Sequence, residues 1–237
     1  MKQPKVIIIT GAANGIGAAV AQLLAPDFSL ILVDKDKQGL IRCYDLLVAD
    51  NKTANIALYP MDFAGAHDSD YQQLIQHIQD EYGQLDGLIH CAAELGSWGP
   101  VIQQTPAQWL QTMQVNLHAV YLLTRAALLL ISQQTQGLLI FSHADFNTNA
   151  FCGAYGISQT GIKTFSQQLQ AEYGISQPSL MIHCLTLPAV NTALLRRAFP
   201  GIASKNVTDV NTIARQYHLL AHKLYPPSLI GSTVTQP

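Results

Sequence analysis

Short apolar runs alternate with longer segments of helical periodicity along almost the whole chain. The first run, residues 5–10, is apolar at nearly every position, as is typical of a strand buried on both faces of a parallel sheet. Strands are predicted at residues 5–10, 29–33, 55–59, 86–91, 137–142 and 179–186, with an edge strand at 232–235. Helices are predicted at residues 18–24, 37–50, 70–82, 106–132, 153–173 and 209–224, and residues 191–207 are expected to be irregular or partly helical.

This alternation predicts the fold class. Parallel strands need crossover connections, and right-handed crossovers place helices on both faces of the sheet. No linker, repeat or low-complexity tract interrupts the pattern, so we expect one α/β domain over residues 1–237. The expected architecture is a doubly wound parallel sheet of about seven strands, in the order 3-2-1-4-5-6-7.

Composition and charge narrow the range of partners. The chain has 237 residues, of which 49% are hydrophobic and 12% charged, and its formal net charge is −2. This balance is typical of a globular protein, and the absence of a basic run gives no reason to expect nucleic acid. The apolar stretch 122–131 is shorter than the roughly 18 residues of a membrane span and contains Arg125, so no membrane is expected.

Cysteine usage and the N-terminus favour a cytoplasmic protein. The four cysteines contain no Cys-x-x-Cys pair and are interpreted as reduced thiols: Cys43, Cys91, Cys152 and Cys184. The first predicted strand begins almost at once, which leaves no room for a signal peptide.

The histidines do not predict a metal centre. None of the eight histidines belongs to a Glu-flanked zinc pattern. His218 and His222 lie four residues apart on a predicted helix, an arrangement more typical of a surface face than of a metal site. No metal is therefore expected.

A glycine cluster follows the first strand directly, in the pattern Thr-Gly-x-x-x-Gly-x-Gly. Gly11 allows a tight turn, Gly15 lets the backbone approach a ligand, and Gly17 lets the next helix pack close to the strand. The N–H groups at that helix start can bind an anion such as a pyrophosphate. The loop predicts a dinucleotide site made by Gly11, Asn14, Gly15, Ile16 and Gly17, although glycine also serves ordinary strand-to-helix turns.

An acidic residue ends the second strand, about 20 residues after the glycine motif. A carboxylate at this place, Asp34, can bind both hydroxyls of an adenosine ribose and would repel a 2′-phosphate, which favours NAD(H) over NADP(H). Lys35 follows directly, and its charge could instead pair with such a phosphate. The alternative structural interpretation is that Asp34 caps a turn.

The glycine spacing and the residues that follow resemble the short-chain dehydrogenase/reductase family, over nearly the whole chain from Thr10 to Thr192. The resemblance implies a Rossmann-type fold and hydride transfer with NAD(H) or NADP(H). It implies that Asp62 binds the adenine amino group and that Thr192 binds the nicotinamide amide. His90-Cys91-Ala92-Ala93 stands where the family usually has Asn-Asn-Ala-Gly. The cofactor contacts implied in this way are Asp62, Phe63, Cys91, Ala92, Ala93, Gln159, Pro188 and Thr192.

Ser142 and Tyr155 occupy the positions of the family's catalytic pair. Ser142 ends the fifth predicted strand, and Tyr155 follows thirteen residues later at the start of a helix. The resemblance implies that Tyr155 exchanges a proton with the substrate oxygen and that Ser142 orients that oxygen. Asn116 matches a helix Asn that holds a catalytic water in the family.

The family's catalytic Lys, four residues after the Tyr, is replaced here by Gln159. A Gln can hydrogen-bond a ribose hydroxyl, but it carries no charge to lower the pKa of Tyr155. Lys163, one helical turn further, could supply that charge, or it could be a solvated helix lysine.

Two functions are therefore kept open. The first is an NAD(P)-dependent oxidoreductase that interconverts a small-molecule carbonyl and an alcohol, slowed by Gln159. The second is a dinucleotide-binding sensor or assembly protein with weak or no catalysis. Apolar residues on the helices 109–132 and 153–173 further predict a homodimer or homotetramer: Leu117, Val120, Tyr121, Leu128, Phe165 and Leu169. The substrate pocket is expected among Glu94, Leu95, Trp98, His143, Asp145, Phe151, Leu187, Arg196, Arg197 and Phe199.

Overall fold

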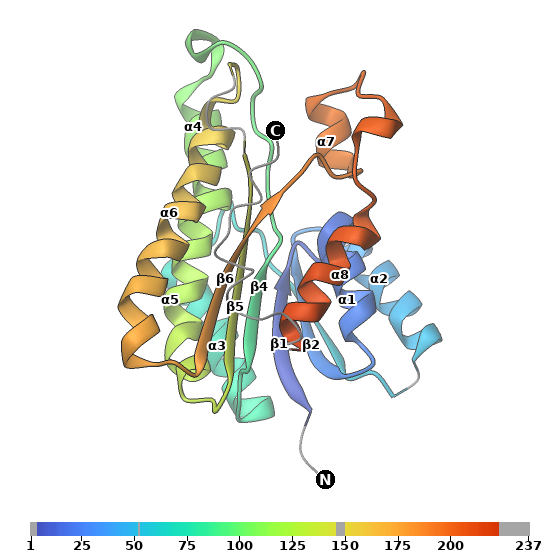
Figure 1. Ribbon diagram of the computed structural model, residues 1–237, viewed down its shortest axis with the longest axis vertical. Coiled ribbons are helices and arrows are strands. Elements are labelled where there is room, and N and C mark those ends of the chain that lie inside the picture. The colour runs from blue at the N-terminus through green and yellow to red at the C-terminus, as the bar shows by residue number, and fades with distance from the viewer. Residues whose placement is uncertain (1–3, 52, 146–149, 223–237) are drawn as a thin grey trace.

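A parallel sheet of six strands, in the order β3-β2-β1-β4-β5-β6, forms the centre of the computed structural model, which describes residues 4–51, 53–145 and 150–222 (Figure 1). The strands are β1 (Lys5–Thr10), β2 (Phe28–Asp34), β3 (Ile56–Pro60), β4 (Gly87–His90), β5 (Gly137–Ala144) and β6 (Leu180–Leu187). The doubly wound fold is confirmed, as is the expected order of these strands. The seventh strand, expected at 232–235, lies outside the described residues.

Helices cover both faces of the sheet. They are α1 (Gly15–Leu24), α2 (Lys37–Asp50), α3 (Asp68–Tyr82), α4 (Pro106–Met113), α5 (Ala119–Ser132), α6 (Gly153–Ser176), α7 (Ala193–Ala198) and α8 (Val210–Ala221). Figure 1 shows α3, α4, α5 and α6 on one side and α1, α2 and α8 on the other. Short 3₁₀ turns lie at η1 (Val101–Gln103) and η3 (Ser204–Asn206).

The apolar side chains of β1 alternate between two hydrophobic clusters, because successive strand residues point to opposite faces. Val6 and Ile8 pack with α3, α5 and α6, whereas Ile7 and Ile9 pack with α1, α2 and α8. Val120 and Leu169 belong to the first cluster and are 5% exposed. These two residues, which the sequence analysis counted among those predicting an oligomer, are instead covered within this cluster of strand and helix residues.

The expected helix 106–132 is present, but it is not a uniform α-helix. It begins with a capping box, in which Thr105 accepts from the Gln108 N–H and Pro106 follows at the first helical position. A π-helical segment, η2 (Gln114–His118), separates α4 from α5. Such wide turns inside α-helices often occur at functional sites.

By length and composition alone, Pro106–Ser132 could cross a membrane. It has 27 residues, and its most apolar window of 18 residues has a mean hydropathy of 1.5, so it extends well beyond the apolar stretch 122–131 considered from the sequence. However, 56% of its apolar window is buried. Leu123 and Ile131 of this segment pack in the core against α3, α6 and the sheet, which is also how the core helix of a soluble domain is covered.

The carboxyl ends of all six strands lie at one edge of the sheet, since every strand pair is parallel. Ligands of doubly wound folds bind outside this edge, where the strand order reverses between β1 and β4. Thr10, Asp34 and His90 end three neighbouring strands there. This edge is where the predicted site residues converge.

Candidate active site

A cavity of about 360 Å³ opens at the carboxyl edge of the sheet. All predicted cofactor-binding and catalytic residues except Gly17 and Asn116 line it: Gly11, Asn14, Gly15, Ile16, Asp34, Asp62, Phe63, Cys91, Ala92, Ala93, Ser142, Tyr155, Gln159, Pro188 and Thr192. Of the residues expected around the substrate, four line it as well, namely Glu94, Leu95, Leu187 and Arg197, whereas Trp98, His143, Asp145, Phe151, Arg196 and Phe199 do not. The structure thus brings both ends of the expected cofactor site and the expected catalytic pair to one cavity.

Two glycines of the loop after β1 are needed for close packing. Gly11 has a φ of 68°, and a Cβ there would lie 2.7 Å from the Ala92 backbone. A Cβ on Gly17 would collide with the Gly11 carbonyl, so this residue lets α1 begin against the loop, as its predicted packing role requires. Gly17 therefore shapes the cavity without lining it.

Thr10 holds the ends of β1 and β4 together, a role that the sequence analysis did not assign. Its Oγ1 accepts hydrogen bonds from the backbone N–H groups of Cys91 (3.1 Å) and Ala92 (3.2 Å), and its side chain is fully buried. The available signal was a hydroxyl residue directly before Gly11, at the last position of the strand.

Asp34 stabilises the local turn and also lies at the cavity. It lines the cavity, and its carboxylate also accepts from the N–H groups of Ala13 (3.0 Å) and Asp36 (2.9 Å). These bonds fix the carboxylate between the glycine loop and the start of α2. Each oxygen retains a second acceptor position for a ligand hydroxyl.

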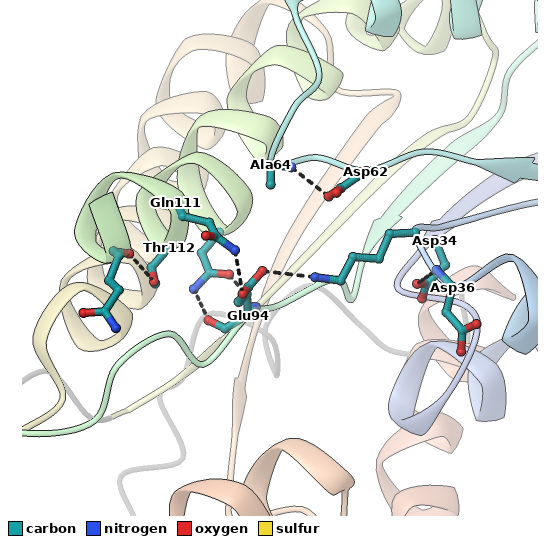
Figure 2. Close-up of polar contacts among 10 residues, drawn as sticks. Asp34, Asp36, Asp62, Ala64, Glu94, Gln111 and Thr112 are labelled. Carbon is teal, nitrogen blue, oxygen red and sulfur yellow. Dashed lines mark hydrogen bonds and ion pairs between the residues drawn. The ribbon is translucent and has the colours of Figure 1, made fainter. Parts of the chain in front are cut away.

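Lys35 forms an ion pair with Glu94, 3.2 Å between Nζ and Oε2, and both residues line the cavity. Figure 2 shows Glu94 between Gln111 and the turn that carries Asp34 and Asp36. Gln111 Nε2 donates to the other Glu94 oxygen at 3.0 Å. The cation next to Asp34 is therefore already partnered by a carboxylate.

Asn116 lies in the π-helical segment and is fully buried away from the cavity. Its Oδ1 accepts from the Glu94 N–H at 2.7 Å, and its Nδ2 donates to the Glu94 carbonyl at 2.8 Å and to Ser158 Oγ at 3.1 Å. The side-chain amide thus holds the segment after β4 in place. These bonds leave little capacity in the side chain for the water expected there.

Tyr155 begins α6 and is 5% exposed. Burial, together with the nearby Cys152, raises the pKa of Tyr155 to about 12. Loss of water disfavours the phenolate, so the pKa lies above that of a free phenol. Leu95 and Ala144 pack against Tyr155, and the Trp98 ring lies 6.0 Å from the tyrosine ring.

Gln159 lies one turn after Tyr155, and its Oε1 accepts from the Ala144 N–H at 2.8 Å. Its Nε2 donates to no group in the described ranges 4–51, 53–145 and 150–222, and the residue lines the cavity. This leaves an amide donor for a ligand.

Ser142 lines the same cavity, but its hydroxyl donates to the His90 carbonyl at 2.8 Å. That hydrogen must leave His90 before Ser142 can donate to a substrate oxygen. His90 is buried and neutral, since desolvation lowers its pKa to about 3, and its Nε2 bonds Thr124 Oγ1.

The charge of Lys163 influences the pKa of other side chains than Tyr155. Burial lowers the pKa of His143, and the charge of Lys163 lowers it further. Burial raises the pKa of the Cys184 thiol, and the charge of Lys163 offsets part of that rise. It is not among the charges that shift the pKa of Tyr155. The second interpretation of Lys163, which gave it no catalytic charge, fits this placement better.

Several expected contacts serve the local fold as well as the cavity. Asp62 accepts from the Ala64 N–H at 3.0 Å (Figure 2), and Thr192 Oγ1 accepts from the Leu195 N–H at 3.2 Å, capping α7. Among the expected pocket residues, the Trp98 ring packs edge-on against Phe199, with centroids 5.3 Å apart. The cavity also has lining residues that the sequence did not single out: Met61, Val115, Ala144, Ile162 and Leu194.

The glycine loop at the switch point, with a buried tyrosine across the cavity, defines a Rossmann-type nucleotide-binding class. Comparison with known families then specifies it: the short chain dehydrogenase model matches residues 5–202. The chain belongs to the short chain dehydrogenase family, which confirms the resemblance inferred from the sequence and the classification as an oxidoreductase of this type.

Individual relatives are similar over most of their length. The curated "Uncharacterized oxidoreductase YciK" of Escherichia coli K12 is 29% identical over 198 residues, covering 83% of this chain and 77% of that protein. A Shigella flexneri short chain dehydrogenase complexed with NADP has a TM-score of 0.85 at 28% identity, covering 91% of this chain and 90% of that one. A counterpart from Escherichia coli CFT073 complexed with NADPH has a TM-score of 0.84 at 29% identity, with the same coverage.

Proposed function

We propose that this chain is an NAD(P)-dependent oxidoreductase that interconverts a small carbonyl compound and the corresponding alcohol. The observation that carries the proposal is the single cavity that joins the glycine loop to Tyr155 and Gln159. The solved relatives that hold NADP and NADPH support a nicotinamide dinucleotide as the cofactor. When bound, this cofactor gives or takes the hydride.

The raised pKa of Tyr155 makes carbonyl reduction the favoured direction. With a pKa of about 12, the phenol keeps its proton at neutral pH. It can donate this proton to the oxygen of a carbonyl as negative charge develops there. Oxidation needs the phenolate and is therefore slow near pH 7. Gln159 anchors the ribose through Nε2, and Ser142 orients the substrate oxygen once its hydroxyl leaves His90.

We further propose that the chain prefers NAD(H), although the two relatives cited contain NADP(H). Asp34 faces the cavity with its carboxylate fixed by two backbone N–H groups. Two cations near Asp34 are already paired, Lys35 with Glu94 and Arg42 with Asp36. A 2′-phosphate would therefore meet the charge of Asp34, and a cation that could offset it would first have to leave a carboxylate partner.

A second candidate function is a dinucleotide-binding sensor or assembly protein. It is favoured by Gln159, which brings no charge to Tyr155, and by the high pKa of Tyr155 that results from burial. Both functions share the cofactor site, and they differ in turnover.

The deciding experiment titrates the chain with NADH and NADPH and then screens carbonyl compounds for loss of cofactor absorbance. We expect tighter NADH binding and slow turnover of at least one carbonyl. Tyr155→Phe should keep NADH affinity and abolish turnover. NADH binding without turnover of any carbonyl would support the sensor instead, and no binding of either cofactor would contradict both functions.

The chain is further proposed to be a cytoplasmic homodimer or homotetramer. Its four cysteines are all unpaired, which suits a reducing compartment. Tyr121 and Ile157, from α5 and α6, are exposed to 43% and 52% and border a shallow apolar groove. A second subunit would cover this surface.

A further inference from the structure

Three potential metal ligands meet at the edge of the sheet opposite the cavity. His218 and His222 lie at the end of α8, and Asp27 directly precedes β2. One ligand atom from each of the three residues lies within 4.8 Å of the other two. Because β2 has seven residues, this cluster is roughly 20 Å from the cavity end of the strand.

The hydrogen bonds of His222 determine which of its nitrogens can bind a cation. Its Nδ1 lies 2.9 Å from the His218 carbonyl, which can only accept, so Nδ1 carries a hydrogen. In the neutral ring Nε2 then carries a lone pair instead of a hydrogen, and it faces Asp27 Oδ2 at 3.1 Å. Two acceptors face each other at this distance, so a proton or a metal ion must join them.

Metal-bound histidines usually have this arrangement. The second ring nitrogen donates to a backbone carbonyl or a carboxylate, which fixes the ring and directs the ligating nitrogen. A separation of 3.1 Å is close to that of neighbouring ligand atoms around a zinc ion, about 3.4 Å in a tetrahedral site.

His218 completes the donor set. Residues four apart share a helix face, and the two imidazole centroids are 4.2 Å apart. A ring nitrogen of His218 is one of the three ligand atoms that lie within 4.8 Å of one another. The negative end of the α8 dipole also favours a cation here.

We propose that His218, His222 and Asp27 bind one divalent transition-metal ion, with zinc as the best-fitting metal and water at the remaining positions. Two imidazoles and one carboxylate suit zinc, and copper or nickel would compete for the same donors. Asp27, whose side chain is 58% exposed, can turn to close the 4.8 Å cluster around an ion. The ion would join the end of α8 to the turn between α1 and β2. Helices α1 and α8 pack against each other (Figure 1).

The test uses the full chain after dialysis against a chelator. We expect calorimetry with zinc chloride at pH 7.5 to show one ion per chain, and the melting temperature to rise with zinc concentration. His218→Ala and His222→Ala should each weaken zinc binding by more than about 100-fold, since loss of even an outer-shell partner costs roughly 10–100-fold. His77→Ala, which removes an exposed histidine of α3, is the matched control and should change nothing.

Cobalt(II) provides a second readout, because its absorption distinguishes nitrogen and oxygen ligands from cysteine sulfur. We expect cobalt absorption bands without a sulfur charge-transfer band, and we expect these cobalt bands to disappear in His222→Ala. Binding that survives both histidine substitutions, or sulfur ligation, would overturn the site. So would the absence of saturable binding, which would leave a protonated His222 paired with Asp27. NADH affinity should stay unchanged in these variants, so the metal site and the proposed function can fail separately.

Discussion

At the scale of single residues, the proton chemistry of Tyr155 depends on the uncharged neighbour that replaces a lysine. Gln159→Lys would place a positive charge one turn away on the same helix. This charge stabilises the phenolate, so the pKa of Tyr155 should fall from about 12. Oxidation needs the phenolate, and its rate should therefore rise at pH 7. The pH profile of NAD⁺-dependent alcohol oxidation, measured for both proteins, should shift to lower pH.

Lys163→Met is the control for this experiment. Because the charge of Lys163 acts on His143 and Cys184, its removal should leave the oxidation profile of Tyr155 in place. A wild-type rate that is flat from pH 7 upward, or one that falls with Lys163→Met, would refute the assignment.

Glu94 should influence cofactor choice through Lys35. Glu94→Gln removes the carboxylate that pairs with this lysine at 3.2 Å and leaves the ammonium available to a 2′-phosphate. We expect the ratio of NADPH to NADH affinity to rise roughly fivefold, equivalent to about 1 kcal/mol for a partly exposed ion pair. Fluorescence titration with both cofactors measures it.

Gln111→Ala removes the other partner of Glu94 without changing any charge, so the ratio should stay constant. An unchanged ratio in Glu94→Gln would show that Lys35 does not reach the phosphate.

The sequence predicted where the site residues lie better than what their atoms do. The glycine spacing, the end of β2 and the Ser142–Tyr155 separation were enough to place these residues around one cavity. The present hydrogen bonds of Ser142 and Asn116 could not be predicted, because their partners, His90 and Glu94, come from a different segment. Residue type sets the capacity for a bond, and only the fold sets the partner.

At the scale of secondary-structure elements, two glycines with opposite surroundings give a matched test. Gly11→Ala would place a Cβ 2.7 Å from the Ala92 backbone at a φ of 68°, so β1 and β4 must separate at the cavity. We expect lower stability and loss of NADH binding. Gly174→Ala, within α6 and with nothing within 4 Å, should instead stabilise the protein by up to about 1 kcal/mol.

Chemical denaturation and NADH titration of both variants measure these effects. An Ala at position 11 that keeps wild-type stability and NADH affinity would show that the loop adapts.

Most elements follow from local pattern, and the exceptions have tertiary causes. The helix at residues 37–50 and the strand at 5–10 were predicted with the observed bounds. Helix α1 begins at Gly15, three residues before its apolar pattern, because Gly17 allows it to start against the loop. The π-helical segment was not predicted, since it includes Asn116, whose amide binds the distant Glu94 backbone.

At the scale of the whole molecule, the proposed oligomer can be tested with two isoleucines of α6. Ile157 is 52% exposed beside the groove of α5 and α6, whereas Ile175 is 94% exposed at the end of the helix. Ile157→Asp should dissociate the subunits, because a charge there would be buried without a partner. Ile175→Asp should leave the oligomer intact.

Light scattering at micromolar concentration distinguishes these states. A monomeric wild-type chain, or an oligomer that tolerates Ile157→Asp, would rule out this surface as the interface.

The two edges of the central strand β1 become paired at different times during synthesis. One edge of β1 pairs with β2 soon after both emerge, but its other edge pairs with β4, where Ile7 lies beside Gly87, eighty residues later. At roughly 5–20 residues per second, the ribosome leaves that apolar edge uncovered for about 4–16 s. The nascent N-terminal half is thus a transient template for unwanted strand pairing, and its protection by chaperones matters most before residue 90 has been made.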